Sequence, residues 1–179
     1  MIERRRQPVP GDLPPDIAEM VGKVAMVMAP AVTADRTQMT AFLSAVEDGN
    51  PLLWDEGVAD ELAGETVAPP AMLSTFMRPG RWLPDGQAPL RAMELHYQLK
   101  ERFGLALAIV GDSEVAMFDP VRPGDRVITE IVLDEIGPEI TNRLGTGRKW
   151  TLLLRYLREC DGALLGTEGI RFFSYNRPS

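Results

Sequence analysis

The chain has 179 residues, of which 45% are hydrophobic and 25% charged, and its formal net charge is −7. That length is sufficient for one domain with a core. The negative charge argues against general affinity for nucleic acid, because the phosphate backbone attracts basic surfaces. Cys160 is the only cysteine, which excludes an intrachain disulfide and a zinc site built on thiolates. We therefore expect a cytoplasmic globular protein.

Residues 1–16 are rich in proline and include the basic cluster Arg4-Arg5-Arg6. Such composition is typical of a solvated terminal segment. We expect a flexible arm over residues 1–16 and a single domain over residues 17–179. No apolar run approaches the length of a membrane span, and no signal-peptide core is present, so we expect neither.

The first half of the domain has helical spacing. A short helix is expected from Ile17, leading into a strand at 23–28. The next helix is expected over 33–45, capped by Thr33 and ended by the glycine and proline of residues 48–51. A further short helix is predicted at 55–62.

Pro69-Pro70 then opens an apolar segment, Ala71 to Met77, which predicts a buried helix. Residues 78–92 contain several prolines and glycines and are expected to form a loop.

The second half has the pattern of an antiparallel sheet. Strands are predicted at 115–118, 126–136, 149–158 and 164–175, with a tight hairpin at Asp161-Gly162. Asp112, Ser113 and Glu114 are interpreted as a polar turn, although a carboxylate and a hydroxyl could also line a pocket. A buried helix against an antiparallel sheet is an α+β arrangement.

Three segments follow one another in the order found in a known family: Asp48-Gly49-Asn50-Pro51-Leu52-Leu53-Trp54-Asp55, then residues 68–73 (Ala-Pro-Pro-Ala-Met-Leu), then residues 118–125, which end in Pro-Gly-Asp. Together they resemble the MaoC-like hydratase/dehydratase family, whose pattern is roughly Asp-x-Asn-Pro-Leu-His-x-Asp. The similarity extends over about residues 33–175 and is greatest to the dehydratase-like N-terminal subgroup.

The resemblance implies a hotdog fold, in which a curved antiparallel sheet wraps around one central buried helix, with residues 71–77 as the start of that helix. It implies hydration of a 2-enoyl thioester to the (3R)-hydroxyacyl thioester, without metal or redox cofactor. In the family an aspartate and a histidine activate water. Here Asp48 occupies the aspartate position, but Leu53 occupies the histidine position. Leucine transfers no proton, so half of the acid/base pair is missing.

The candidate substrate-binding residues lie in three places: Asn50 beside the catalytic segment, Pro70, Ala71, Met72 and Phe76 at the helix entrance, and His96. Family members often have a glycine at the entrance whose N–H binds the thioester carbonyl, and Pro70 cannot supply this N–H, whereas Ala71 can. Met72 and Phe76, with Met77 and Trp82, could line an acyl channel or simply form core.

Two candidates also have structural interpretations. Asp48 could be the surviving catalytic carboxylate or a turn-former that bonds its own backbone. His96, the only histidine, could replace the lost base, but a packed structural histidine is the more common finding.

The sequence leaves three hypotheses open. In the first, the chain is a degenerate-site hotdog subunit that shapes the acyl pocket beside a catalytic partner chain, with coenzyme A or an acyl-carrier protein as the thioester carrier. In the second, it is a homodimer that binds an acyl thioester or hydrophobic ligand without turnover. In the third, Asp48 and His96 form a rearranged active site for hydration or thioester hydrolysis. The acyl chain and the stoichiometry are not determined by the sequence.

Overall fold

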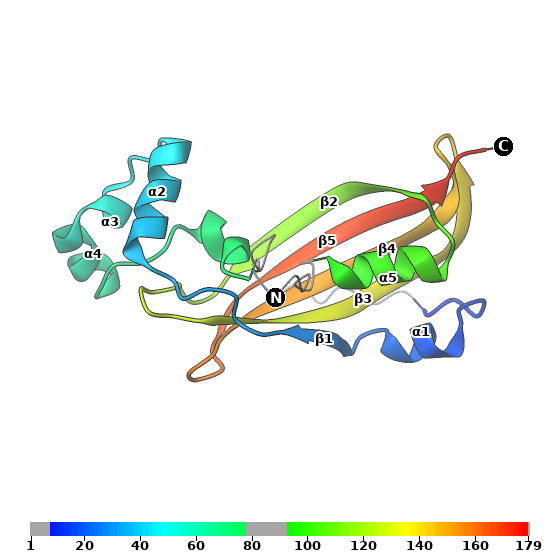
Figure 1. Ribbon diagram of the computed structural model, residues 1–179, viewed down its shortest axis with the longest axis horizontal. Helices are drawn as coiled ribbons and strands as arrows, with labels where there is room; N and C mark the ends of the chain where they lie inside the picture. Colours follow the sequence, from blue (N-terminus) through cyan, green and yellow to red (C-terminus); the bar gives the residue numbers. More distant parts are fainter. Residues whose placement is uncertain (1–7, 78–92, 179) are drawn as a thin grey trace, which may run out of the picture.

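The computed structural model describes residues 8–77 and 93–178. Its main feature is a five-stranded antiparallel sheet with the order β1-β3-β4-β5-β2. The strands are β1 (Val24–Met28), β2 (Leu107–Met117), β3 (Val127–Asn142), β4 (Gly145–Arg158) and β5 (Leu164–Asn176). The three long strands β3, β4 and β5 lie at the centre, and the two edges are β1 and β2 (Figure 1).

The central strands form two successive hairpins. The first joins β3 to β4 through Asn142 and Gly145, which face each other at its end. The second joins β4 to β5 around Asp161-Gly162, as the sequence predicts, and Gly162 has a positive φ of 72° that glycine adopts without strain. The hairpins set the register in which Trp150 faces Phe172 and Leu154 faces Glu168.

One face of the sheet carries the core. Alternate residues of β4 are buried, including Trp150, Leu152, Leu154 and Tyr156, as the twofold repeat of a strand requires. Helix α5 (Glu94–Arg102) lies along the sheet in Figure 1 and buries Leu95, His96 and Leu99. This is the α+β arrangement that the sequence predicts.

The central-helix prediction requires a correction. Residues 71–77 do not form an α-helix; Pro70–Thr75 forms a six-residue 3-10 helix, η1. Among the described elements, the α-helix that packs on the sheet is α5, which begins at Glu94. Pro70, in the first turn of η1, cannot donate a backbone hydrogen bond. The predicted loop at 78–92 lies outside the described residues.

A group of short helices projects beyond one end of the sheet (Figure 1). It consists of α2 (Arg36–Val46), α3 (Pro51–Trp54) and α4 (Glu56–Ala63). Asp35, and not the predicted Thr33, caps α2, because its carboxylate accepts a hydrogen bond from the Gln38 N–H at 2.9 Å. We call residues 36–63 the helical lobe.

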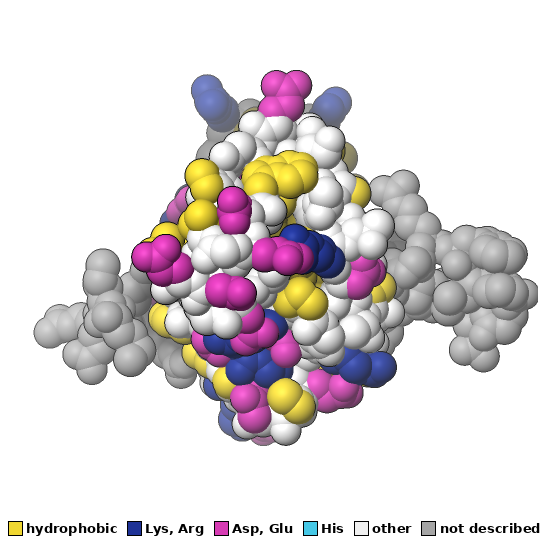
Figure 2. Space-filling view, turned by 90° about the vertical axis from the view of Figure 1, so that its left-hand side faces the viewer, with side chains coloured by type: hydrophobic (Ala, Val, Ile, Leu, Met, Phe, Trp, Pro, Cys, Tyr) yellow, Lys and Arg dark blue, Asp and Glu magenta, His cyan; other side chains and the backbone are white. Residues whose placement is uncertain are grey.

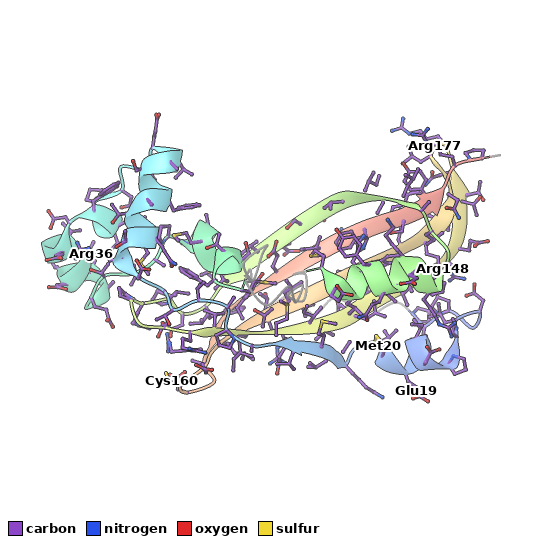
Figure 3. The ribbon with its side chains drawn as sticks, viewed as in Figure 1. Glu19, Met20, Arg36, Arg148, Cys160 and Arg177 are labelled. Atoms are coloured by element: carbon purple, nitrogen blue, oxygen red, sulfur yellow. The ribbon has the colours of Figure 1, made fainter. Side chains whose placement is uncertain are left out.

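The N-terminal segment packs against the opposite end of the sheet. Helix α1 (Pro15–Met20) precedes β1, and Leu13 belongs to the core. Asp12 forms an ion pair with Arg148 of β4, whose position near α1 and α5 is labelled in Figure 3. Residues 12–16 of the expected arm are therefore in contact with the domain, and residues 1–7 lie outside the described part of the chain. The domain boundary stays a prediction.

The predicted polar turn at Asp112-Ser113-Glu114 is wrong, because these residues lie within β2. Asp112 forms an ion pair with Arg171 of β5 at 2.7 Å. Polar residues fit there because β2 is an edge strand with most of its length exposed. Within residues 8–77 and 93–178, no helix is both long and apolar enough to span a bilayer.

Candidate functional site

The segment with the family's catalytic pattern forms a capped turn between α2 and α3. Glu47 ends α2 with a positive φ of 55°, and the Asp48 carboxylate accepts a hydrogen bond from the Asn50 N–H at 3.0 Å. The Asn50 side chain in turn accepts from the Leu52 N–H at 3.1 Å and caps α3. Asp48 and Asn50 therefore both hydrogen-bond to local backbone, which is the structural role weighed for Asp48.

Leu53 lies in α3 and is half-buried. The next residue, Trp54, donates its indole N–H to the Asp48 carbonyl and so closes the turn from the other side. Asp55 begins α4, accepting from the N–H groups of Gly57 at 2.8 Å and Val58 at 3.2 Å. Figure 2 views the molecule from this end, where acidic and basic side chains are interspersed with small apolar patches.

A cavity of about 410 Å³ lies beside η1. Its walls come from η1 and from three strands, and the lining residues are Pro70, Ala71, Leu73, Ser74, Val115, Met117, Tyr156 and Glu168. The volume falls within the range of small-molecule sites, about 300–1,000 Å³. Two predicted substrate residues, Pro70 and Ala71, therefore line a cavity of suitable size.

Met72 and Phe76 have a different position. Both are buried in the hydrophobic core, together with Met77, and neither is among the residues that line this cavity. Their burial favours the core interpretation. Trp82 lies outside the described residues.

His96 is packed among aromatic rings on α5. Its ring centroid lies 4.1 Å from that of Phe172, 5.5 Å from Trp150 and 5.4 Å from Tyr97. Burial, and to a smaller extent the positive charge of Lys100, lowers the pKa of His96 to about 4. Among the described residues, its Nδ1 atom has no hydrogen-bond partner.

The structure does not bring His96 and Asp48 together. Asp48 lies in the helical lobe, beyond one end of the sheet, whereas α5 lies along the other half (Figure 1). The rearranged Asp48–His96 site therefore has no support in the geometry of this chain.

Sequence reasoning missed two polar residues of the cavity, Tyr156 and Glu168. The Tyr156 hydroxyl donates a hydrogen bond to Glu168 Oε2 at 2.6 Å, and Tyr156 is fully buried. They are twelve residues apart on neighbouring strands, and only the β4–β5 register brings them together. Glu168 interrupts a face of β5 that otherwise carries Gly166, Ile170 and Phe172, and this is the sequence signal that points to it.

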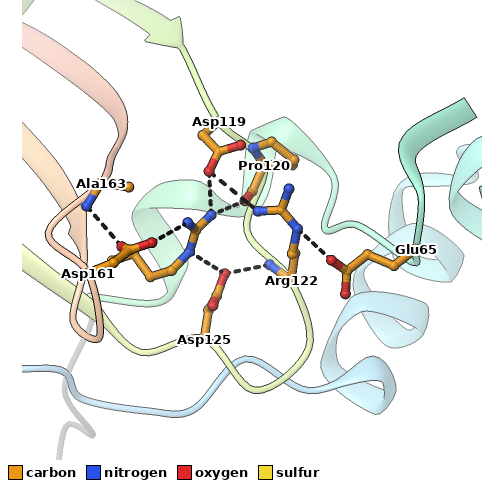
Figure 4. A network of polar contacts seen from close by, with 8 residues as sticks. Glu65, Asp119, Pro120, Arg122, Asp125, Asp161 and Ala163 are labelled. Atoms are coloured by element: carbon orange, nitrogen blue, oxygen red, sulfur yellow. Dashed lines mark hydrogen bonds and ion pairs between the residues drawn. The ribbon is translucent and has the colours of Figure 1, made fainter.

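Residues 118–125, the third segment of the family resemblance, are organised by a buried arginine (Figure 4). Arg158 of β4 binds Asp119, Asp125 and Asp161, with N–O distances of 3.2 Å to Asp125 and 3.1 Å to Asp161. Burial alone would lower the pKa of Arg158, but the hydrogen bonds to these carboxylates raise it. The guanidinium therefore stays charged, as a buried arginine with several acidic partners should.

Arg122 extends this network toward η1. Its side chain binds Asp119 at 3.3 Å and Glu65 at 2.8 Å, and Glu65 precedes η1 in the chain. The Ala68 N–H also donates to the Val121 carbonyl at 2.8 Å. These contacts hold residues 65–68, which lead into η1. None of the network residues is among those that line the cavity.

Metal ligation has no evident location. In the part of the chain that the structure describes, no three His, Cys, Asp or Glu side chains are grouped to hold a metal ion. The residues with polar side chains that line the cavity are Ser74, Tyr156 and Glu168.

Comparison with known sequences gives one informative relative. No family model matches the chain. A protein from Thermomonospora curvata, described as a probable enoyl-CoA hydratase alpha subunit, is 29% identical over 136 residues. The match covers 75% of this chain and 42% of the relative, so the chain spans less than half of that protein's length.

Comparison with solved structures shows the fold. A chain of the ChsH1–ChsH2 complex from Mycobacterium tuberculosis matches with a TM-score of 0.72 and 19% identity, covering 92% of this chain and 93% of that one. A MaoC-like dehydratase from Rhodospirillum rubrum has a TM-score of 0.55 and 18% identity, covering 87% and 94%. The (R)-hydratase from A. caviae has 0.53 and 18%, covering 84% and 95%. These likenesses confirm the hotdog fold, and a MaoC-like dehydratase and an (R)-hydratase are among the proteins that share it.

Proposed function

We propose that the chain is a degenerate-site hotdog subunit of an (R)-specific 2-enoyl-CoA hydratase, or of the corresponding 3-hydroxyacyl thioester dehydratase. A partner chain with an intact Asp/His pair would supply the acid/base chemistry, and this chain would shape the acyl pocket. The observation that carries the proposal is Leu53 in the histidine position of a segment whose Asp48 carboxylate binds local backbone. General acid/base catalysis contributes about 10²–10⁴-fold, so its loss leaves little activity.

The cavity beside η1 supports a role in binding the acyl group. Its lining is mostly apolar, and it includes Ala71, whose N–H is present where Pro70 has none. The relative named as an enoyl-CoA hydratase subunit supports the thioester class. Coenzyme A and an acyl-carrier protein are both retained as carriers.

The edge strand β2 supports a partner chain. Among the described strands, β2 pairs only with β5, and it exposes apolar side chains of Ile109, Val110 and Val115. Natural proteins usually cover or pair such an edge. The neighbour with the TM-score of 0.72 was itself solved as a complex. The proposed partner is a second hotdog chain in the cytoplasm, added at this edge.

A non-catalytic homodimer that binds an acyl thioester or hydrophobic ligand is the second candidate. The same cavity and the same edge favour it, because neither requires a dyad in this chain.

Light scattering of the purified chain, alone and after co-expression with a hotdog chain that has the full Asp-x-Asn-Pro-Leu-His-x-Asp pattern, separates the two. A heteromer supports the subunit, and a stable homodimer that ignores the second chain supports the binding protein. A monomer in both experiments contradicts both candidates.

A further inference from the structure

Glu168 occupies an unusual position on the core-facing side of the sheet. Its cross-strand neighbours are Leu154 on β4 and Val115 on β2. Gly166 and Ile170, two residues away along β5, share its face because side chains alternate with a period of two. The carboxyl group therefore has apolar neighbours on its face of the sheet. Leucine, valine and isoleucine fill the neighbouring positions, and Glu168 is a charged residue among them.

A carboxyl group in apolar surroundings costs free energy unless hydrogen bonds compensate. The Tyr156 hydroxyl supplies one, to Oε2 at 2.6 Å. A carboxylate offers about four acceptor positions, so one donor among the described residues leaves most of these positions unused. Both side chains line the cavity of about 410 Å³, so a group bound there lies next to the carboxylate.

The rest of the cavity indicates what kind of group would enter. Leu73, Val115 and Met117 provide apolar walls, and Val115 is 55% exposed, so the cavity has an open side at the sheet edge. An ammonium group would be expensive to desolvate against these walls. A hydroxyl group is cheaper to bury than an ammonium group, and it donates one hydrogen bond, which a remaining acceptor position of Glu168 can accept.

We propose that this cavity binds a predominantly apolar chain that carries a hydroxyl group, with Glu168 accepting the hydrogen bond of that hydroxyl and Tyr156 holding the carboxylate in place. The assignment of this chain to an acyl thioester rests on the proposed function; the preference for a hydroxyl rests on Glu168 and Tyr156 alone. The pair is then a specificity determinant, because an unhydroxylated chain would remove water from the carboxylate and leave Tyr156 as its one hydrogen-bond donor among the described residues.

The test measures binding by calorimetry with two matched thioesters, decanoyl-CoA and the same thioester with a hydroxyl at the end of the acyl chain. Hydrogen bonds to charged groups correspond to about 10-fold to 100-fold in affinity, so the hydroxylated ligand should bind at least about tenfold more tightly. Decanol, which has the hydroxyl but no thioester, is the third ligand.

The informative variant is Tyr156→Phe/Glu168→Leu. Replacing both partners by apolar groups of similar shape is nearly neutral for stability, so a thermal melt should confirm folding. The variant should lose or reverse the preference for the hydroxylated ligand. Glu139→Leu, an exposed position on β3 outside the cavity lining, is the matched control and should retain the preference.

Equal binding of the two thioesters to the natural chain, or an unchanged preference in the double variant, overturns the inference. So does the absence of binding by all three ligands. If neither thioester binds but decanol binds the natural chain and not the double variant, the hydroxyl site stands and the thioester function fails. If both thioesters bind equally, the thioester function stands and the hydroxyl site fails.

Discussion

Acid sensitivity should be linked to His96. The pKa of this buried ring is about 4 in the folded chain, whereas an unfolded histidine titrates at about 6.5. Below about pH 6.5 the His96 ring is protonated in the unfolded state but stays neutral in the folded state. The free energy of unfolding therefore falls as the pH drops from about 6.5 toward 4. Below about pH 4 this contribution becomes constant.

The size of this loss in the free energy of unfolding follows from the difference between the folded and unfolded pKa values of His96. One pKa unit corresponds to about 1.36 kcal/mol, and the part of the shift that falls between about pH 7 and pH 4.5 amounts to about 2.5 kcal/mol. The rings that lie against His96 belong to Tyr97, Trp150 and Phe172.

The measurement is urea unfolding of the natural chain and of His96→Gln at both pH values. Glutamine is neutral at each, while the carboxylates common to the two proteins contribute equally and cancel in the difference. We expect the natural chain to lose about 2.5 kcal/mol more than His96→Gln on acidification. Equal losses in the two proteins would refute the assignment of a buried, neutral His96.

The remaining predictions concern packing, capping and the catalytic segment. Gly166→Ala should destabilise the fold by about 1–3 kcal/mol in denaturant, because its Cβ would lie 2.6 Å from the Leu73 side chain and 2.7 Å from a backbone oxygen; Gly169→Ala, with its nearest atom at 3.9 Å, should cost less. Asp55→Ala should cost about 1 kcal/mol by removing the α4 cap, measured by thermal melt. Leu53→His should give a measurable gain in enoyl-CoA hydration, and a folded, thioester-binding variant without any gain would contradict the alignment of this segment.

The central strands were predictable because their residues favour extended structure on both sides of a clear turn. The Val-, Ile- and Thr-rich segment before residue 137 and the Asp161-Gly162 turn indicate β3 and the β4–β5 hairpin directly. Most of β2 was missed because residues 111–114 are polar, and a polar edge strand has the composition of a loop. Pairing with β5, which sequence periodicity does not reveal, decides that segment.

The site was predictable only in part. Pro70 and Ala71 are candidates because the family resemblance places a backbone N–H donor at the helix entrance, and both line the cavity; their role in binding stays a prediction. Tyr156 and Glu168 were not found, since their contact depends on the register between two strands. The start of the central helix was misplaced because residues 71–77 are apolar enough for a buried α-helix, whereas apolar content does not distinguish an α-helix from a 3-10 helix.

Hydration of crotonyl-CoA and of a longer enoyl-CoA by the purified chain, without any partner, tests the degenerate-site function most directly. We expect turnover at or near background, because Leu53 cannot transfer a proton and Asp48 binds the backbone of its own turn. The same assay with an intact hotdog partner should show activity. Turnover by the chain alone that approaches that of an enzyme with the full dyad, and that Asp48→Ala abolishes, would contradict the proposal.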